Sequence, residues 1–278
     1  MPTPDAGLFG PGSITWRVNR EQALLLGGGR ALLLQLAHPL VAAGVADHSD
    51  FRSDPLKRLR RTLDTTLAII FGTTDEARRS AEGIRAVHAR VRGTLRTQTG
   101  GLAAGTPYQA EDPALLAWVN ATLFETSIST YELLFGRLTD DELARYYAES
   151  GTVARLLGVP DDGLPPAFEA WRAWWDSELA GDRVAVSEDG RELAEAVLTP
   201  HLRFVPRPAF APLSLFTVGL LPAAVRDAYG YRWTIAHEAA FRAEARALSM
   251  TVRRLPSAVR FFPQARRAER RIAAQAAA

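Results

Sequence analysis

The sequence contains no cysteine among its 278 residues and a single lysine, Lys57. Without thiols there is no disulfide framework, no thiolate metal site and no cysteine nucleophile. Acidic and basic residues nearly cancel, 31 against 33, for a formal net charge of +2. Because a nucleic-acid-binding protein usually carries a larger and more clustered basic excess, the composition argues against nucleic acid as a partner.

The sequence also lacks a long uncharged apolar run. Its most apolar stretch, residues 23–46, contains three consecutive glycines together with Arg30, Gln35, His38 and Pro39. A bilayer span needs about 20 predominantly apolar residues, so this stretch does not qualify. The first residues show no basic leader followed by an apolar core. We therefore expect a cytoplasmic protein without an integral membrane segment.

Hydrophobic spacing is helical almost throughout, and no clear alternating segment predicts a strand. Prolines fall mainly at the starts of the helical segments, where they are tolerated. No low-complexity linker or internal repeat divides the chain. These patterns predict an all-α fold, a single multi-helix domain over residues 1–278 with a globin-like helical core. The core is expected at about residues 10–263, followed by a basic C-terminal tail at residues 264–278.

Local signals place the expected helices. Thr73 and Glu76 have capping-box spacing, which predicts a helix from there to about Arg96. The glycine run at residues 27–29 is expected to be a flexible break between helices. The other helices are predicted at residues 19–26, 30–47 with a bend at Pro39, 56–70, 114–135, from 139 onward, 165–179, 191–198, 212–220, 222–229, 233–254 and 263–276.

Most catalytic motifs are absent. The sequence has no dinucleotide or phosphate-binding loop, no nucleophile elbow, no His-Glu-x-x-His pair and no EF-hand loop. The five histidines are too far apart in the sequence to form a two-histidine face on one helix. His48 with Asp47 and Asp50 has the chemistry of a hard-cation site, although a helix end and turn is the simpler interpretation.

His88 differs from the other histidines because of its neighbours. On a helix, Ala81, Ile84, His88, Val91 and Leu95 would share one apolar face. Two interpretations remain open at this point. His88 is either a core histidine hydrogen-bonded to a carbonyl group, or a neutral imidazole presented to a haem iron.

Several short segments together resemble one known family of helical oxygenases. That family contains the bacterial latex-clearing rubber oxygenases and the fungal oxygenase that cleaves a prenyl chain during mycophenolic acid synthesis. The order and spacing of the pieces carry the resemblance, which spans about residues 10–263. The pieces are residues 58–62 (RLRRT), 71–73 (FGT), 85–93 (RAVHARVRG), 107–113 (PYQAEDP) and 116–122 (LAWVNAT), with further matches at 12–16, 36–45 and 221–233.

The resemblance implies a haem b cofactor. In the rubber oxygenases a histidine in a His-x-x-Val-Arg setting is the proximal iron ligand, and residues 88–92 of this sequence match that setting. His88 is therefore the implied axial ligand of the iron. Arg85, one turn earlier, and Arg92 are the implied cofactor-binding residues, with Arg85 placed to meet a haem propionate or to orient the histidine.

The resemblance also implies a polar distal side. The family's Arg-x-x-Lys-Thr segment corresponds to Arg58, Arg61 and Thr62, with Arg61 in the place of the lysine. Thr62 is expected to hydrogen-bond dioxygen, and the arginines to stabilise negative charge developing on it. His38, at the bend before Pro39, is a further distal candidate, with a helix-capping or core role as the alternative.

The expected function is thus a haem b-dependent oxygenase that uses dioxygen on an apolar small molecule, such as an alkene or prenyl compound. One alternative is a non-catalytic helical protein that binds an apolar ligand and has lost the haem site, since Asn120 stands where bacterial relatives often have a histidine. Another is an interaction module using the C-terminal arginines on anionic lipid or nucleic acid, although a solvated tail is the ordinary interpretation. Trp171, Trp174 and Trp175 are expected to wall an apolar cavity or, more simply, to form core.

Overall fold

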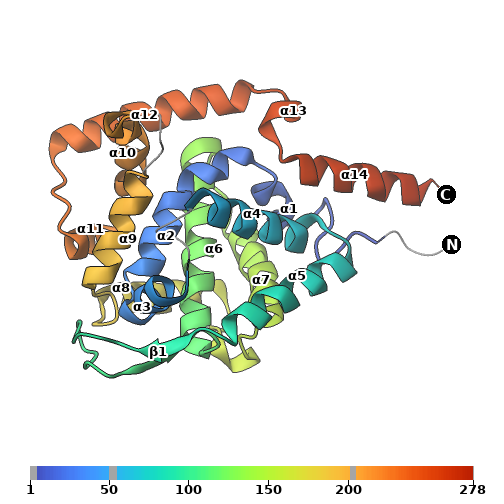
Figure 1. The fold of residues 1–278 in the computed structure, drawn as a ribbon. Helices are drawn as coiled ribbons and strands as arrows, with labels where there is room; N and C mark the ends of the chain where they lie inside the picture. The colour runs from blue at the N-terminus through green and yellow to red at the C-terminus, as the bar shows by residue number, and fades with distance from the viewer. Residues whose placement is uncertain (1–4, 50–54, 201–204, 278) are drawn as a thin grey trace.

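The structure, a computed structural model, describes residues 5–49, 55–200 and 205–277, without the side chains of residues 55–59. Helices make up most of the fold within these ranges (Figure 1). The sheet found there is a single antiparallel hairpin of β1 (Arg92–Thr94) and β2 (Pro107–Gln109). The predicted all-α class is confirmed, with this small hairpin as an addition.

The helices differ greatly in length, from single turns to six turns. In chain order they are α1 (Ile14–Asn19), the 3-10 helix η1 (Gln22–Gly27), α2 (Gly28–Leu36), α3 (Pro39–His48), α4 (Pro55–Phe71), α5 (Thr74–His88), α6 (Pro113–Phe135), α7 (Asp140–Leu156), η3 (Asp161–Gly163), α8 (Phe168–Ala180), α9 (Glu188–Leu198), η4 (Arg207–Phe210), α10 (Ala211–Leu220), α11 (Ala223–Tyr229), α12 (Ile235–Arg254), α13 (Ser257–Arg260) and α14 (Pro263–Ala276).

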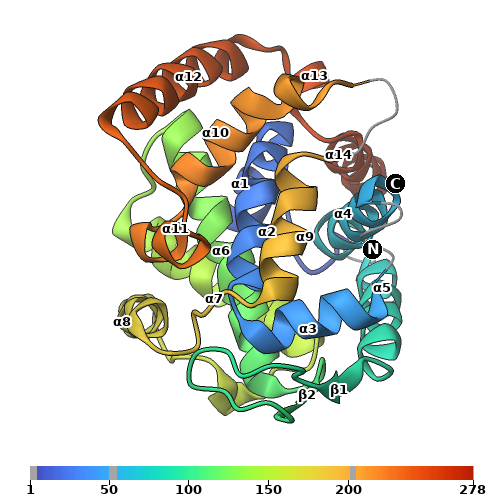
Figure 2. The ribbon, with the colours of Figure 1, turned by 60° about the vertical axis from the view of Figure 1, so that its left-hand side comes forward.

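The longest helix, α6, runs through the middle of the molecule beside α2 (Figures 1 and 2). Its start is fixed by Asp112, whose carboxylate accepts the Ala114 backbone N–H at 2.8 Å, and by proline in the first turn. Its end falls at Gly136, which has a φ of 108° that other residues rarely adopt. Because α6 is apolar on most sides, it is the element around which the main core packs.

The glycine run at residues 27–29 serves close packing. Gly28 opens α2, and the neighbouring glycines lie against other helices. A β-carbon at Gly27 would lie 2.3 Å from Thr130 Oγ1, and one at Gly29 would lie 2.5 Å from Thr217 Oγ1. The predicted break between helices lies here, because η1 ends at Gly27 and α2 begins at Gly28. The absent side chains also let η1 approach α6 and α2 approach α10.

The helix that carries His88 ends earlier than predicted. It was expected to continue to about Arg96, but α5 ends at His88 and the chain turns into β1. Val91 and Leu95, which looked like further members of the helical stripe, instead pack with Tyr108 and Ala43. Tertiary packing of the hairpin against α3 thus overrides a spacing that is locally helical.

Residues 263–276, treated above as helix within a basic tail, form the docked helix α14. Its buried Ala265 and Ala268 pack on Phe71 of α4 and on Trp16 of α1. In both views α14 lies beside α4 (Figures 1 and 2). The backbone N–H of Asp5 donates to the Gln275 side chain at 3.0 Å.

Among the described residues, no single helix has the length and apolar character of a membrane span. The segments Gln22–Leu36 and Pro39–His48 would pass such a test only together, and they are bent by 106° at the break between them.

Candidate functional site

His88 is the last residue of α5 and lies on that helix's inward stripe. Ala77 and Ala81 of the same stripe are buried, Ile84 is half-buried, and His88 is half-buried. Its Nδ1 atom is buried and has no hydrogen-bond partner. The stripe was correctly predicted as far as the helix extends, and it leaves one imidazole nitrogen without a partner in the protein.

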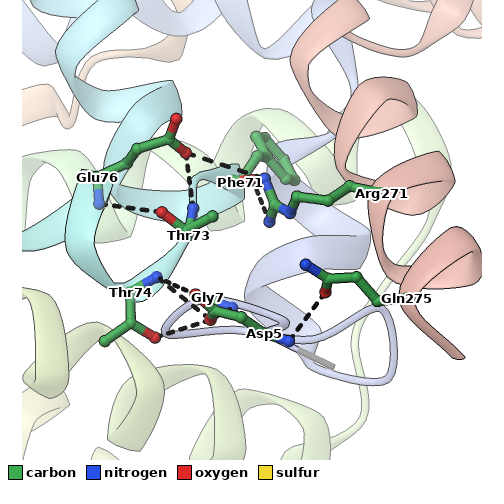
Figure 3. Close-up of polar contacts among 8 residues, drawn as sticks. All are labelled: Asp5, Gly7, Phe71, Thr73, Thr74, Glu76, Arg271 and Gln275. Atoms are coloured by element: carbon green, nitrogen blue, oxygen red, sulfur yellow. Dashed lines mark hydrogen bonds and ion pairs between the residues drawn. The ribbon is translucent and has the colours of Figure 1, made fainter. Parts of the chain in front are cut away.

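The beginning of α5 is held firmly by polar contacts (Figure 3). Thr73 and Glu76 form the predicted capping box, with the Thr73 N–H donating to Glu76 Oε2 at 2.8 Å. Asp5 adds a second clamp, because its carboxylate accepts from the Thr74 hydroxyl at 2.9 Å and from the Gly7 N–H at 2.9 Å. The helix that presents His88 is thereby anchored to the N-terminal segment.

The charge state of His88 follows from burial. Removal from water lowers the pKa of His88 below its ordinary 6.5, while the Glu111 carboxylate acts in the opposite direction. A lowered pKa keeps the imidazole neutral at neutral pH. The neutral form is the one that can donate an electron pair to a metal.

His38 occupies the break between α2 and α3. It caps α3, since its Nδ1 accepts the Leu40 N–H at 3.3 Å. Accepting at Nδ1 places the proton of the neutral ring on Nε2. Burial lowers the pKa of His38 to about 4, with the Arg183 charge adding to this and Asp112 opposing it. The helix-capping interpretation of His38 therefore has direct geometric support.

The two histidines border the same end of α6. The charge of Glu111 acts on the pKa of His88, and the charge of the next residue, Asp112, acts on the pKa of His38. Leu40, just after His38, packs in one cluster with Val91, just after His88. The ring of His38 lies 6.2 Å from that of Trp118 in α6, and the buried Trp118 Nε1 has no hydrogen-bond partner. Sequence reasoning did not single out Trp118, whose unpaired N–H only the packing reveals.

The candidate distal and cofactor-contact residues are less enclosed. Arg61 and Thr62 on α4 are exposed, and so are Arg85 on α5 and Arg92 on β1. Arg92 donates to the Ala89 carbonyl at 2.6 Å. Among the described residues no hydrogen bond or ion pair joins Thr62 or Arg61 to His88. The side chain of the remaining candidate, Arg58, lies outside the described residues.

Two other sequence candidates have structural partners. His48 Nε2 lies 3.0 Å from the Arg92 carbonyl, and Asp47 accepts the Tyr108 hydroxyl at 2.6 Å, so both tie α3 to the hairpin. Asp50, the third member of that cation hypothesis, lies outside the described residues. In the described ranges no group of three histidine or carboxylate residues could hold a metal ion.

The aromatic cluster of α8 belongs to the core. Trp171 and Trp175 are buried and stack on each other with ring centroids 5.9 Å apart, and Trp175 stacks on Trp118 at 5.4 Å. Trp174 packs at the edge of the same cluster. Asn120 lies on the side of α6 that faces α7, with its side-chain oxygen 3.5 Å from the Ser150 hydroxyl.

Similar sequences indicate the family to which this chain belongs. Two mycobacterial proteins, Uncharacterized protein Rv2237 of Mycobacterium tuberculosis and Uncharacterized protein Mb2261 of Mycobacterium bovis, are each 29% identical to this chain over 225 residues. Each match covers 76% of this chain and 81% of the relative. No solved structure matches the chain. Residues 16–254 match the catalytic domain described as ER-bound oxygenase mpaB/B'/Rubber oxygenase, and the chain therefore belongs to this oxygenase family.

Proposed function

We propose that this protein is a haem b-dependent oxygenase that acts on an apolar small molecule, such as an alkene or prenyl compound, with His88 as axial ligand. The observation that carries the proposal is the state of that side chain. His88 is half-buried, its Nδ1 is buried without a partner, and burial lowers its pKa, which favours the neutral ring. It lies within the range matched by an oxygenase catalytic domain.

His88 is the residue that would hold the cofactor. Haem carries most of its iron ligands itself, so the protein would need to supply only a histidine and a shaped surrounding. This suits a chain whose described residues contain no set of three metal-ligating side chains. The buried Nδ1 of His88 has no partner in the protein, and such atoms are usually satisfied by a water, an ion or a ligand.

When bound, haem supplies the activation of dioxygen, and the chain supplies position and environment. In the proposal His88 holds the cofactor, and its lowered pKa keeps a proton off the ligating nitrogen. Arg85 and Arg92 supply positive charge near it for the carboxylates at the cofactor's edge. Thr62 would donate a hydrogen bond to dioxygen.

The remaining candidates are assigned by charge and protonation. Arg58 and Arg61 provide positive charge where negative charge develops in the reaction. His38 contributes a fixed N–H at Nε2, because its Nδ1 is occupied by the Leu40 N–H and its pKa is about 4. Being unable to take up a proton at neutral pH, His38 would orient a group and would not act as a base.

A haem titration tests the proposal. Wild-type protein and the His88→Ala variant are titrated with haem and followed by the Soret band, with His237→Ala as a matched control because His237 is exposed on α12. We expect saturable binding by wild type and His237→Ala, and loss of most binding by His88→Ala. Circular dichroism melts accompany the titration, and the loss of a half-buried ring should cost less than about 2 kcal/mol.

A second variant separates binding from turnover. Thr62→Ala should retain haem with an unchanged Soret position, while turnover of an alkene substrate falls. If His88→Ala binds haem as tightly as wild type, His88 is not the ligand. If wild-type protein itself binds no haem, the non-catalytic apolar-ligand-binding alternative replaces the oxygenase proposal.

A further inference from the structure

The helix α12 lies at the outer edge of the molecule in both views (Figures 1 and 2). Its inner side packs on α6 and α10 through Phe241, Ala245 and Val252, each at most 9% exposed. With 20 residues, α12 is about 30 Å long. Its outward side is therefore a long surface open to the surroundings of the protein.

This outward side of α12 is apolar as well. Ile235, the first residue of the helix, is 91% exposed, and Met250, near its end, is 56% exposed. A surface helix usually keeps polar residues on the side that faces water. Residues at spacings of three and four positions instead form an exposed apolar row opposite Phe241 and Val252, made of Ala236, Ala240, Ala243, Ala247 and Met250.

The charged residues on the outward side are all arginines. Arg246, Arg253 and Arg254 are exposed there. Arg253 donates to the Leu134 carbonyl at 2.7 Å, which leaves its charge unneutralised. Within the described ranges, no carboxylate forms an ion pair with any of these three arginines.

The two acidic residues of α12 lie on its inner half and are both half-buried. The Glu238 carboxylate accepts the Trp233 Nε1–H at 2.9 Å and the Arg242 Nε–H at 2.6 Å. Burial raises the pKa of Glu244, which favours its neutral form. Neither residue places a negative charge on the outward side.

The positive charge of α12 is part of a larger asymmetry along the chain. Residues 231–278 hold ten arginines and three glutamates, a balance of +7. Because the whole chain has a formal net charge of +2, residues 1–230 carry a balance of −5. Such an asymmetry directs the C-terminal part of the chain toward an anionic partner.

Some of the C-terminal arginines are already engaged within the fold. Arg260 forms two hydrogen bonds to the Glu21 carboxylate, at 2.6 and 2.7 Å. Arg271 donates to the Phe71 carbonyl at 3.2 Å and lies 3.9 Å from Glu76 (Figure 3). The outward arginines of α12 differ from these two because no carboxylate in the described part of the chain neutralises them.

An apolar row flanked only by arginines matches the surface of an anionic membrane. We propose that the outward side of α12 docks on an anionic lipid bilayer, with the helix parallel to the membrane plane. Arg246, Arg253 and Arg254 contact lipid phosphates. Ile235 and Met250 enter the boundary between headgroups and acyl chains.

Two other occupants fit this side less well. A nucleic acid duplex presents phosphates to arginines but no apolar layer to the row that ends at Met250. A second copy of the chain would bring arginine-rich surfaces of like charge together. The proposed docking does not depend on whether the protein holds haem.

Vesicle flotation of the full-length protein tests the proposal. Vesicles of phosphatidylcholine and phosphatidylglycerol in equal parts are compared with vesicles of phosphatidylcholine alone. We expect the protein to float with the anionic vesicles at low salt, to be released at high salt because ions screen surface charges, and not to float with the neutral vesicles. No binding to the anionic vesicles, or equal binding to both kinds, would overturn the proposal.

Variants locate the contact. Arg246→Ala and Arg254→Ala should each weaken binding to anionic vesicles about fivefold. Met250→Asp should also weaken it, because it places a carboxylate against an anionic surface. Arg145→Ala is the matched control, since Arg145 is exposed on α7. An equal loss in Arg145→Ala and Arg246→Ala would show adsorption by net charge alone and would contradict docking through α12.

The absence of cysteine allows a direct reading of insertion. An environment-sensitive fluorophore is attached to Met250→Cys and, as a control, to Arg145→Cys. On anionic vesicles the emission of the first should shift to the blue, while that of the second should stay unchanged. Equal shifts at the two positions, or none at either, would refute the proposed orientation.

Two results would assign the surface to another occupant. One is duplex DNA that binds as tightly as the vesicles, without any emission shift at position 250 on lipid. The other is a dimer in sedimentation velocity that Met250→Asp converts to monomers. Either result would replace lipid as the partner of α12.

Discussion

The buried ion pair between α2 and α6 offers a quantitative test of the packing. Arg30 is 1% exposed, and its guanidinium contacts the Glu125 carboxylate. It also donates to Thr126 Oγ1 at 2.7 Å and to the Leu220 carbonyl at 2.7 Å. Burial lowers the pKa of Arg30, and the Glu125 charge opposes this. Glu125 is therefore the counter-charge that makes this buried cation tolerable.

Replacing Glu125 by alanine should leave that cation buried with neutral acceptors only. Removing one partner of a buried pair typically costs about 3–5 kcal/mol. For a domain of this size that loss corresponds to a fall in Tm of roughly 10 °C. The measurement is urea unfolding followed by circular dichroism, with the linear extrapolation compared between wild type and variant.

The double variant Arg30→Met/Glu125→Leu decides the interpretation. Because it removes the charge along with its partner, it should recover most of the stability lost in Glu125→Ala. If the double variant instead has a lower free energy of unfolding than Glu125→Ala, the loss of Arg30 adds its own cost. The two side chains are then not coupled. The reasoning about the buried pair would then be wrong.

Three further predictions concern packing, pH and inhibition. Gly29→Ala should lower the free energy of unfolding by about 1–3 kcal/mol through its clash with Thr217, while Gly28→Ala, which meets nothing within 4 Å, should raise it slightly in thermal melts. Burial lowers the pKa of His38 to about 4 in the folded protein, so the unfolded chain takes up a proton at a higher pH than the folded one. About 3 kcal/mol of the free energy of unfolding is therefore fully present above pH 6.5 and is lost as the pH falls toward 4. In unfolding titrations across this range, His38→Asn, which keeps a helix cap, should weaken the pH dependence. Cyanide should inhibit oxygenase turnover, whereas thiol-alkylating reagents should not, because the chain has no cysteine.

Local signals in the sequence were reliable where local chemistry decides the structure. The capping box of Thr73 and Glu76 appears as predicted, and α6 starts at Pro113, one residue before the predicted start at residue 114. The end of α5 did not follow from the sequence, because Leu95 is buried by the hairpin and α3 and not by a continuing helix. Such a choice between two burial partners depends on contacts far apart in the chain.

The same limit applies to charge. Arg30 in the apolar N-terminal stretch counted against a membrane span, but its burial against Glu125 was not predictable from spacing, since the partner lies in a different helix. Conversely, the apolar helical stripe did predict the inward direction of His88. The family resemblance implied that Arg61 and Thr62 line the distal side of a cofactor pocket, and it did not predict that both side chains are exposed.

The most direct test of the central claim is chemical rescue of the proposed ligand. The haem spectrum of His88→Ala is recorded after reconstitution, with and without added imidazole. If His88 is the axial ligand, the variant alone should lose the wild-type Soret band, and imidazole should restore it by filling the space that the side chain left. If His88→Ala shows the wild-type spectrum without imidazole, the account of this site is contradicted.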